Sequence, residues 1–144
     1  MRQYYAVIDT SVIVSSFLCR DSIPGKVIDY IQNNTIIPLF NKEILEEYRD
    51  VLARNKFRLR QEDVTRFLSE FKQKGKELSR VATSEPFTDK SDVVFFEIVL
   101  SGRSTMDAYL VTGNLRHYPF RSYVVTPRQM LEIIEKEKDV PPLW

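Results

Sequence analysis

The stretch YYAVIDTS, residues 4–11, begins with five apolar or aromatic residues and then becomes polar, with Asp9 at the change. A continuous apolar run of this kind is typical of a strand buried on both faces of a parallel sheet. A carboxylate at the end of such a strand is costly to bury unless a partner compensates its charge. Two interpretations of Asp9 therefore stand side by side: it caps the helix that follows, or it binds a cation.

Beyond this stretch, strand-like apolar runs alternate with amphipathic helical patterns. Strands are expected at residues 3–8, 35–40, 80–83, 108–112 and 123–126, and helices at residues 11–18, 22–34, 40–55, 61–78, 92–100 and 127–136. Pro38 indicates that the second strand lies at an edge of the sheet or ends there. The alternation predicts an α/β fold with helices packed on a mostly parallel sheet. Ligands of such sheets bind at the carboxyl ends of the strands.

Local signals mark the ends of several helices. Asn41 is suited to cap the N-terminus of the helix after it, and Thr126 and Gln129 have the spacing of a capping box. The asparagine pair that ends at Asn34 is suited to stop the second helix, and Gly102 stands where the fifth helix is expected to close.

Composition narrows the class of protein. The chain has 144 residues, which we expect to form one domain over residues 1–144. Lys and Arg total 21 and Asp and Glu total 20, so contact with nucleic acid would require a local basic patch. The single cysteine, Cys19, excludes an internal disulfide framework and fits a reducing compartment. Because no apolar run approaches membrane-spanning length, we expect a cytoplasmic protein without membrane contact.

Two further acids lie where the helical pattern brings them near the core. Glu47 follows Ile44 by three residues and precedes Val51 by four, which places it at the border of an apolar stripe. Asp92 opens a helix that is apolar on nearly every side. Each has an ordinary alternative, as a boundary side chain that extends to solvent or as an acid favoured at a helix N-terminus.

Other polar residues are tied less closely to a site. Asn114 follows the fourth strand and is delivered to the same sheet edge as Asp9, although glycine–asparagine is also common in turns. Asp107 precedes that strand and is expected in a capping or loop role. Asp89 is expected to start a turn, and Glu97 to lie on the solvated side of its helix.

Several catalytic chemistries are excluded by residue type. His117 is the only histidine, which excludes a His-rich metal site. The sequence has no Gly-rich phosphate loop and no GxSxG motif, and Cys19 has no neighbouring histidine. What remains is a set of acids converging on one sheet edge, and oxygen ligands of this kind are preferred by Mg²⁺ and Mn²⁺.

In their order and spacing, five segments resemble the PIN-domain family, in the branch that contains toxin components of toxin–antitoxin systems. The segments are VIDTSVIVSSF (7–17), NKEILEEYRDVL (41–52), TDKSDVVFFEIVLSG (88–102), DAYLVTGNLRHYPF (107–120) and YVVTPRQMLEII (123–134). The resemblance implies a three-layer α/β/α sandwich. It also implies a ribonuclease that depends on Mg²⁺ or Mn²⁺ and hydrolyses phosphodiester bonds in RNA.

The resemblance also implies roles for individual residues. Asp9, Glu47 and Asp92 correspond to acids that hold the metal. The fourth catalytic position falls on Asn114, where many relatives carry aspartate. An asparagine can offer a carbonyl oxygen to a cation but lacks the charge that would hold a second ion. On this interpretation, three hydroxyls are expected to hydrogen-bond the metal ligands: Thr10, Ser11 and Thr112.

Binding partners follow from the same interpretation. Arg116 and His117 lie just beyond the site and are expected to contact RNA phosphates, with a solvated loop as the alternative. A toxin role would bring a cognate antitoxin that blocks the acidic pocket with a basic side chain. Homodimers are common in the family, and the apolar tail VPPLW (140–144) would serve an interface or pack on the body of the protein.

Two other functions are also considered. The first is a catalytically attenuated module that binds RNA or a protein partner, which is favoured by Asn114 and by the nearly neutral charge. The second is hydrolysis of small phosphorylated substrates on another α/β fold. This function is disfavoured because Ser11 occupies the position where a DxD pair would need its second aspartate.

Overall fold

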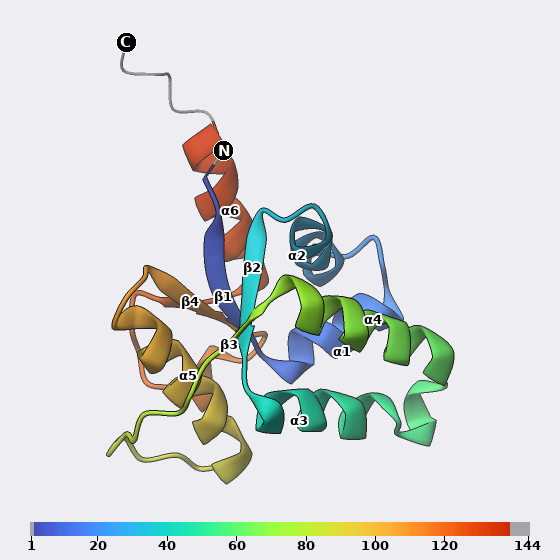
Figure 1. The fold of residues 1–144 in the computed structure, drawn as a ribbon, viewed down its shortest axis with the longest axis horizontal. Helices are drawn as coiled ribbons and strands as arrows, with labels where there is room; N and C mark the ends of the chain where they lie inside the picture. The colour runs from blue at the N-terminus through green and yellow to red at the C-terminus, as the bar shows by residue number, and fades with distance from the viewer. Residues whose placement is uncertain (1, 139–144) are drawn as a thin grey trace.

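The apolar run at the start of the chain forms the central strand of a five-stranded parallel sheet. In the computed structural model, which describes residues 2–138, the strand order is β3-β2-β1-β4-β5 (Figure 1). The strands are β1 (Tyr4–Ile8), β2 (Ile36–Phe40), β3 (Lys76–Glu77), β4 (Ala108–Val111) and β5 (Val124–Val125). β1 pairs with β2 on one side and β4 on the other, so Ala6, Val7 and Ile8 are fully buried. A strand covered on both faces has no need of alternating polar residues.

Helices pack on both faces of this sheet. The helices are α1 (Thr10–Leu18), α2 (Ile23–Gln32), α3 (Lys42–Leu52), α4 (Gln61–Lys74), α5 (Val93–Arg103) and α6 (Pro127–Lys138). α5 packs on β1, β2 and β4, whereas α2 packs on β2 and contacts α1 and α6 (Figure 1). This arrangement confirms the predicted three-layer α/β/α sandwich. No helix within residues 2–138 is both long and apolar enough to cross a membrane. The tail at 140–144 lies outside the described residues.

Three of the predicted helix-end signals are present. Asn41 Oδ1 accepts a hydrogen bond from the Ile44 backbone N–H at 2.9 Å at the start of α3. In the capping box of α6, the Thr126 N–H donates to Gln129 Oε1 at 2.8 Å and the Gln129 N–H donates to Thr126 Oγ1 at 3.1 Å. Asn34 adopts a left-handed conformation, φ 68°, just after α2. These local signals position the helices because they satisfy backbone groups left unpaired at helix ends.

The expectation that Pro38 marks a sheet edge or a strand end is wrong, because Pro38 lies within β2 between two neighbouring strands. Successive backbone groups of a strand point to opposite sides, and the Phe40 carbonyl accepts a hydrogen bond from Leu78 on the β3 side. The backbone nitrogen of Pro38, two residues before Phe40, therefore also points toward the β3 side. The pairing of β2 with β3 begins only at Leu39, after this nitrogen. The proline costs no ladder hydrogen bond at that position.

Two further predictions are wrong: residues 80–83 do not form a strand, and Glu97 is not solvated. Glu97 lies in α5 and is buried. It accepts hydrogen bonds from Arg80 Nε at 2.6 Å and from the Thr83 backbone N–H at 3.0 Å. The segment is therefore held by a side chain of α5, and its Thr83 N–H is not available to a neighbouring strand.

Gly102 has a different role from the one expected, since it lies in the last turn of α5 and not after it. A Cβ atom at this position would approach Leu39 Cδ1 to 2.9 Å and Ala108 Cβ to 3.1 Å. The missing side chain thus allows α5 to pack closely on β2 and β4. Asp107 lies in the exposed loop before β4, as expected, with its carboxylate 3.3 Å from Arg103.

Candidate metal-binding and catalytic site

The candidate site lies at the carboxyl ends of β1 and β4, the two adjacent strands between which the order of the sheet reverses. In open parallel sheets this switch point is the usual place for a ligand. Asp9 follows β1 and Thr112 follows β4. The Asp9 backbone N–H donates to the Val111 carbonyl at 2.9 Å, and Thr112 Oγ1 donates to Asp9 Oδ2 at 2.7 Å. The pairing of the two strands therefore fixes the carboxylate of Asp9.

Asp9 is only 7% exposed, and hydroxyl groups surround its carboxylate. Besides Thr112, Ser11 Oγ donates to Oδ2 at 3.0 Å and the Tyr118 hydroxyl donates to Oδ1 at 3.3 Å. The residue stands in the N-cap position of α1, but its side chain accepts no hydrogen bond from the helix backbone. The cap interpretation thus fits the backbone of Asp9 and not its carboxylate.

Asp92 brings a second buried carboxylate to the same place. It closes the 3-10 turn η2 (Lys90–Asp92), immediately before α5, and is 8% exposed. Its Oδ1 lies 3.5 Å from the Tyr118 hydroxyl, which also reaches Asp9. Burial, and after it the negative charge of Asp9, raises the pKa of Asp92 to about 6. Two carboxylates that share one hydroxyl therefore resist being ionised together.

Glu47 lies beside this pair without joining it directly. It is half-buried on α3, and its Oε2 accepts a hydrogen bond from Thr10 Oγ1 at 2.8 Å. Its negative charge contributes to the raised pKa values of Asp92 and Tyr48. Within residues 2–138, no group of three acidic, histidine or cysteine side chains lies close enough together to hold a metal ion.

Asn114 and His117 form a hydrogen-bonded extension of Asp92. Asn114 Nδ2 lies 2.8 Å from His117 Nε2, and His117 Nδ1 lies 3.3 Å from Asp92 Oδ2. If the amide donates to Nε2, the neutral histidine carries its proton on Nδ1, where it faces the carboxylate. Asn114 is exposed, and its side chain points at His117. Arg116, also exposed, lies in the same 3-10 turn, η3 (Leu115–His117).

Tyr118 is the residue that sequence reasoning missed. It is 6% exposed, its ring packs against Phe87, and its hydroxyl is shared by Asp9 and Asp92. Burial and the two nearby negative charges raise the pKa of its phenol well above the usual range. The only sequence signal was a tyrosine in a polar loop that follows the carboxyl end of a predicted strand.

The chemistry of this donor set fits one hard divalent cation. Asp9 and Asp92 offer carboxylate oxygens that no Lys or Arg within residues 2–138 neutralises. A cation between them would relieve the repulsion that raises the pKa of Asp92. Glu47, held by Thr10, could reach such an ion only through a water molecule or a side-chain movement.

Comparison with known proteins gives one match. A sequence model described as "PIN domain" matches residues 5–116, whereas no curated protein and no solved structure matches the chain. The matched range includes Asp9, Glu47, Asp92 and Asn114 and ends two residues before Tyr118. PIN domains are generally metal-dependent nucleases. The match spans well over half of the sequence, and the chain belongs to the PIN-domain family.

Proposed function

We propose that the protein is an endoribonuclease that requires Mg²⁺ or Mn²⁺ and hydrolyses RNA phosphodiester bonds beside Asp9 and Asp92. The observation that carries this proposal is the pair of buried carboxylates at the sheet switch point, linked by one tyrosine hydroxyl and paired with no Lys or Arg among the described residues. Such a pair is unfavourable in isolation, so a bound cation is the partner that explains it. Asp9 and Asp92 would hold the ion directly, and Glu47 would support it through water.

A divalent cation bound there would supply the charge that offsets a phosphodiester under attack and would lower the pKa of a coordinated water. The protein's own residues would orient these partners. Thr112 and Ser11 hold the Asp9 carboxylate from one side. His117 contacts Asp92, and Asn114 holds the far side of the imidazole ring. Asn114 would therefore act through His117, and Arg116 would contact a phosphate of the RNA.

The test is RNA cleavage by the purified protein in Mg²⁺, in Mn²⁺ and in a chelator, for wild type and Asp9→Asn. We expect cleavage that needs the metal and is lost in the variant. Calorimetric titration with Mn²⁺ gives a second readout, in which Asp9→Asn should bind the ion more weakly. Equal cleavage by both proteins would contradict the assignment of Asp9.

The alternative function is a module of the same fold that binds RNA or a protein without cleaving RNA. It is favoured by the absence, within residues 2–138, of a third acid or histidine close enough to complete a metal site, and by the neutral side chain of Asn114. Asn114→Asp distinguishes the two. If a nuclease is held back by the missing charge, the variant should cleave RNA faster than wild type. If the variant binds Mn²⁺ and stays inactive, the binding function is favoured.

For the cellular role, we propose a cytoplasmic toxin whose activity is blocked by a small antitoxin protein. The antitoxin would place a Lys or Arg side chain against Asp9 and Asp92, a partner that the site lacks within the described residues. Induced expression should arrest growth, and the arrest should disappear with Asp9→Asn. Co-expression of a small protein encoded beside the gene should restore growth to cells that make the wild-type protein.

A further inference from the structure

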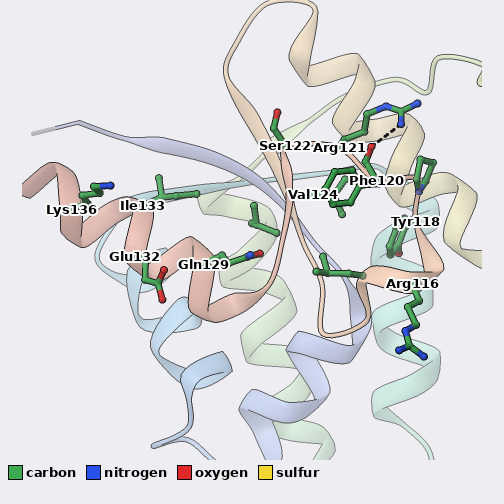
Figure 2. A pocket seen from close by; sticks show the side chains of 13 residues that line it. Arg116, Tyr118, Phe120, Arg121, Ser122, Val124, Gln129, Glu132, Ile133 and Lys136 are labelled. Carbon is green, nitrogen blue, oxygen red and sulfur yellow. Dashed lines mark hydrogen bonds between the residues drawn. The ribbon is translucent and has the colours of Figure 1, made fainter.

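Tyr118 lies in a loop that has little other support. Among residues 113–122 it is the only buried residue, and Phe120, two positions later, is 97% exposed. On one side the loop borders a groove of about 630 Å³, and α6 forms the opposite wall of that groove (Figure 2). Because the groove separates this part of the loop from α6, the support of Tyr118 has to come from its other side.

The segment at residues 79–89, which follows β3 and leads to η2, supplies that support. None of its residues is buried, but Phe87 is half-buried. The centroid of the Phe87 ring lies 6.1 Å from that of Tyr118, at an interplanar angle of 79°, and 5.7 Å from that of Phe96 in α5. Edge-to-face contacts of this kind are favourable between aromatic rings. Phe87 therefore links the Tyr118 ring to α5 and the core.

An ion pair ties the same two segments together. Arg121 of the loop pairs through Nη2 with Glu85 of the 79–89 segment, and its Nη1 donates to the Phe120 carbonyl at 2.8 Å (Figure 2). Both partners of the ion pair are partly exposed, so its contribution is small and adds to that of Phe87. Segments with so few buried side chains open at low cost when a contact is lost. Each of the two segments therefore depends on its contacts with the other.

The two segments meet where the carboxylates lie. Asp92 closes η2, three residues after the 79–89 segment ends. The Tyr118 hydroxyl lies 3.3 Å from Asp9 Oδ1 and 3.5 Å from Asp92 Oδ1. Both distances are at the long end of the range for a hydrogen bond, so a small displacement of the ring would break the two contacts. The placement of that ring thus decides whether the hydroxyl orients the carboxylates.

We infer that Phe87 is a positioning residue, whose ring sets the place of the Tyr118 hydroxyl between the two carboxylates of the proposed metal site. The ion pair of Glu85 with Arg121 has the same role to a smaller extent. The inference rests on the proposed function and adds to it a support that touches neither the ion nor the RNA. Tyr118 and Arg121 lie beyond residue 116, where the match to the family model ends, so family membership does not by itself specify these contacts.

The first test is the affinity for Mn²⁺, measured by calorimetric titration without RNA. Phe87→Ala should weaken Mn²⁺ binding by up to about 10-fold, which is the contribution expected of the Tyr118 hydroxyl itself. Phe87→Tyr keeps an aromatic ring and should bind the ion like wild type. Glu85→Gln should weaken binding about 2- to 5-fold, as the loss of a partly exposed ion pair implies. The matched control is Phe67→Ala, which should change nothing, because half-buried Phe67 forms its T-shaped pair with Phe17.

A double-substitution cycle separates positioning of the hydroxyl from general support of the site. In a Tyr118→Phe background the ring remains and the hydroxyl is gone, so Phe87→Ala should have no further effect on the Mn²⁺ affinity. If Phe87→Ala weakens binding equally in both backgrounds, Phe87 acts through Asp92 and the inference is wrong. Equal Mn²⁺ affinity of folded Phe87→Ala and wild type would also overturn it.

Hydrogen–deuterium exchange in a chelator gives a second readout, which needs no metal. Phe87→Ala should raise the exchange of backbone amides at residues 113–122 on the order of 2- to 10-fold, because the loop loses an aromatic contact, and Phe67→Ala should not. Unchanged exchange there would overturn the inference even if wild type binds Mn²⁺ and cleaves RNA. If wild type binds no Mn²⁺, the proposed function fails, and the exchange at residues 113–122 still decides whether Phe87 holds Tyr118 in place.

Discussion

Two buried carboxylate regions in this protein differ in what surrounds them. Glu97 is a buried residue of α5 and is neutralised by Arg80, which also contacts Glu43. Asp9 and Asp92 are equally buried, yet they receive hydroxyl groups and a histidine, with no Lys or Arg in contact within residues 2–138. A buried acid with its own cation is complete as a structural element. A buried pair without one is suited to binding a cation from solution.

The largest expected effect is a loss of RNA cleavage, and it should follow a substitution in the Asp9–Asp92 region. Asp92→Asn should reduce RNA cleavage by more than about 100-fold, because it removes a proposed metal ligand. The metal-free protein should become more stable, because the repulsion between Asp92 and Asp9 is gone. Cleavage assays and urea unfolding in a chelator measure the two effects. Asp50→Asn, at an exposed position on α3, is the control and should alter neither. If Asp92→Asn instead loses stability and keeps its cleavage activity, Asp92 is a structural acid like Glu97 and not a metal ligand.

The second effect is on stability and falls on the other region. Glu97→Gln should lower the free energy of unfolding by about 1–2 kcal/mol, since it removes a charge-assisted hydrogen bond of a partly exposed pair. RNA cleavage by the folded variant should stay near that of wild type. Urea unfolding measures the loss, with exposed Glu46→Gln as the matched control. Loss of cleavage with unchanged stability would place Glu97 in the site and end the distinction between the regions.

The third effect is a pH dependence of protein stability, which arises from the Asp9–Asp92 pair when no metal is bound. The pKa of Asp92 rises from an ordinary 3.8 to about 6 on folding, through burial and the charges of Asp9, Asp89 and Glu47, while His117 opposes the shift. The folded state then binds the proton more tightly than the unfolded state. Its contribution to stability is complete below pH 3.8 and is lost as pH rises through about 6.

Thermal unfolding of metal-free protein across this pH range measures the loss. Asp92→Asn should remove this component of the slope. Saturating Mg²⁺ should stabilise wild type more above pH 6 than below it, because the ion requires ionised carboxylates. If Asp92→Asn unfolds with the same pH dependence as wild type, repulsion within the Asp9–Asp92 pair does not contribute to that dependence.

The smallest effect comes from the hydroxyl that joins the two carboxylates. Tyr118→Phe should weaken Mn²⁺ binding by about 10-fold, because the carboxylates lose a group that orients them. It should cost about 1 kcal/mol of stability. Calorimetric titration and urea unfolding measure these changes. Tyr109→Phe, at a half-buried tyrosine near Asp107 at the opposite end of the sheet, is the control. An unchanged metal affinity would reduce Tyr118 to a packing residue.

The same contrast explains what could be predicted from the sequence. Asp9 and Thr112 were predictable because each follows a continuous apolar strand, and the ends of parallel strands share one edge. Asp92 was recognisable as an acid on an otherwise apolar helix. The environment of Glu97 was not predictable, because Arg80 and Thr83 reach it from an irregular segment with no periodic pattern. Tyr118 was missed for a related reason, since no periodicity reveals which way a loop residue points.

The pairing of β1 with β4 has a consequence for the newly made chain. Asp9 hydrogen-bonds Thr112, 103 residues later, and Tyr118, 109 residues later. A chain still emerging from the ribosome holds Asp9 without either partner until Thr112 and Tyr118 have been made. Contacts of such long sequence separation form late, after their loop entropy has been overcome. The proposed RNA-cleaving site would therefore assemble only after the chain has been made beyond Tyr118, which would keep the ribosome-bound message and the RNAs around it from being cut by an incomplete enzyme.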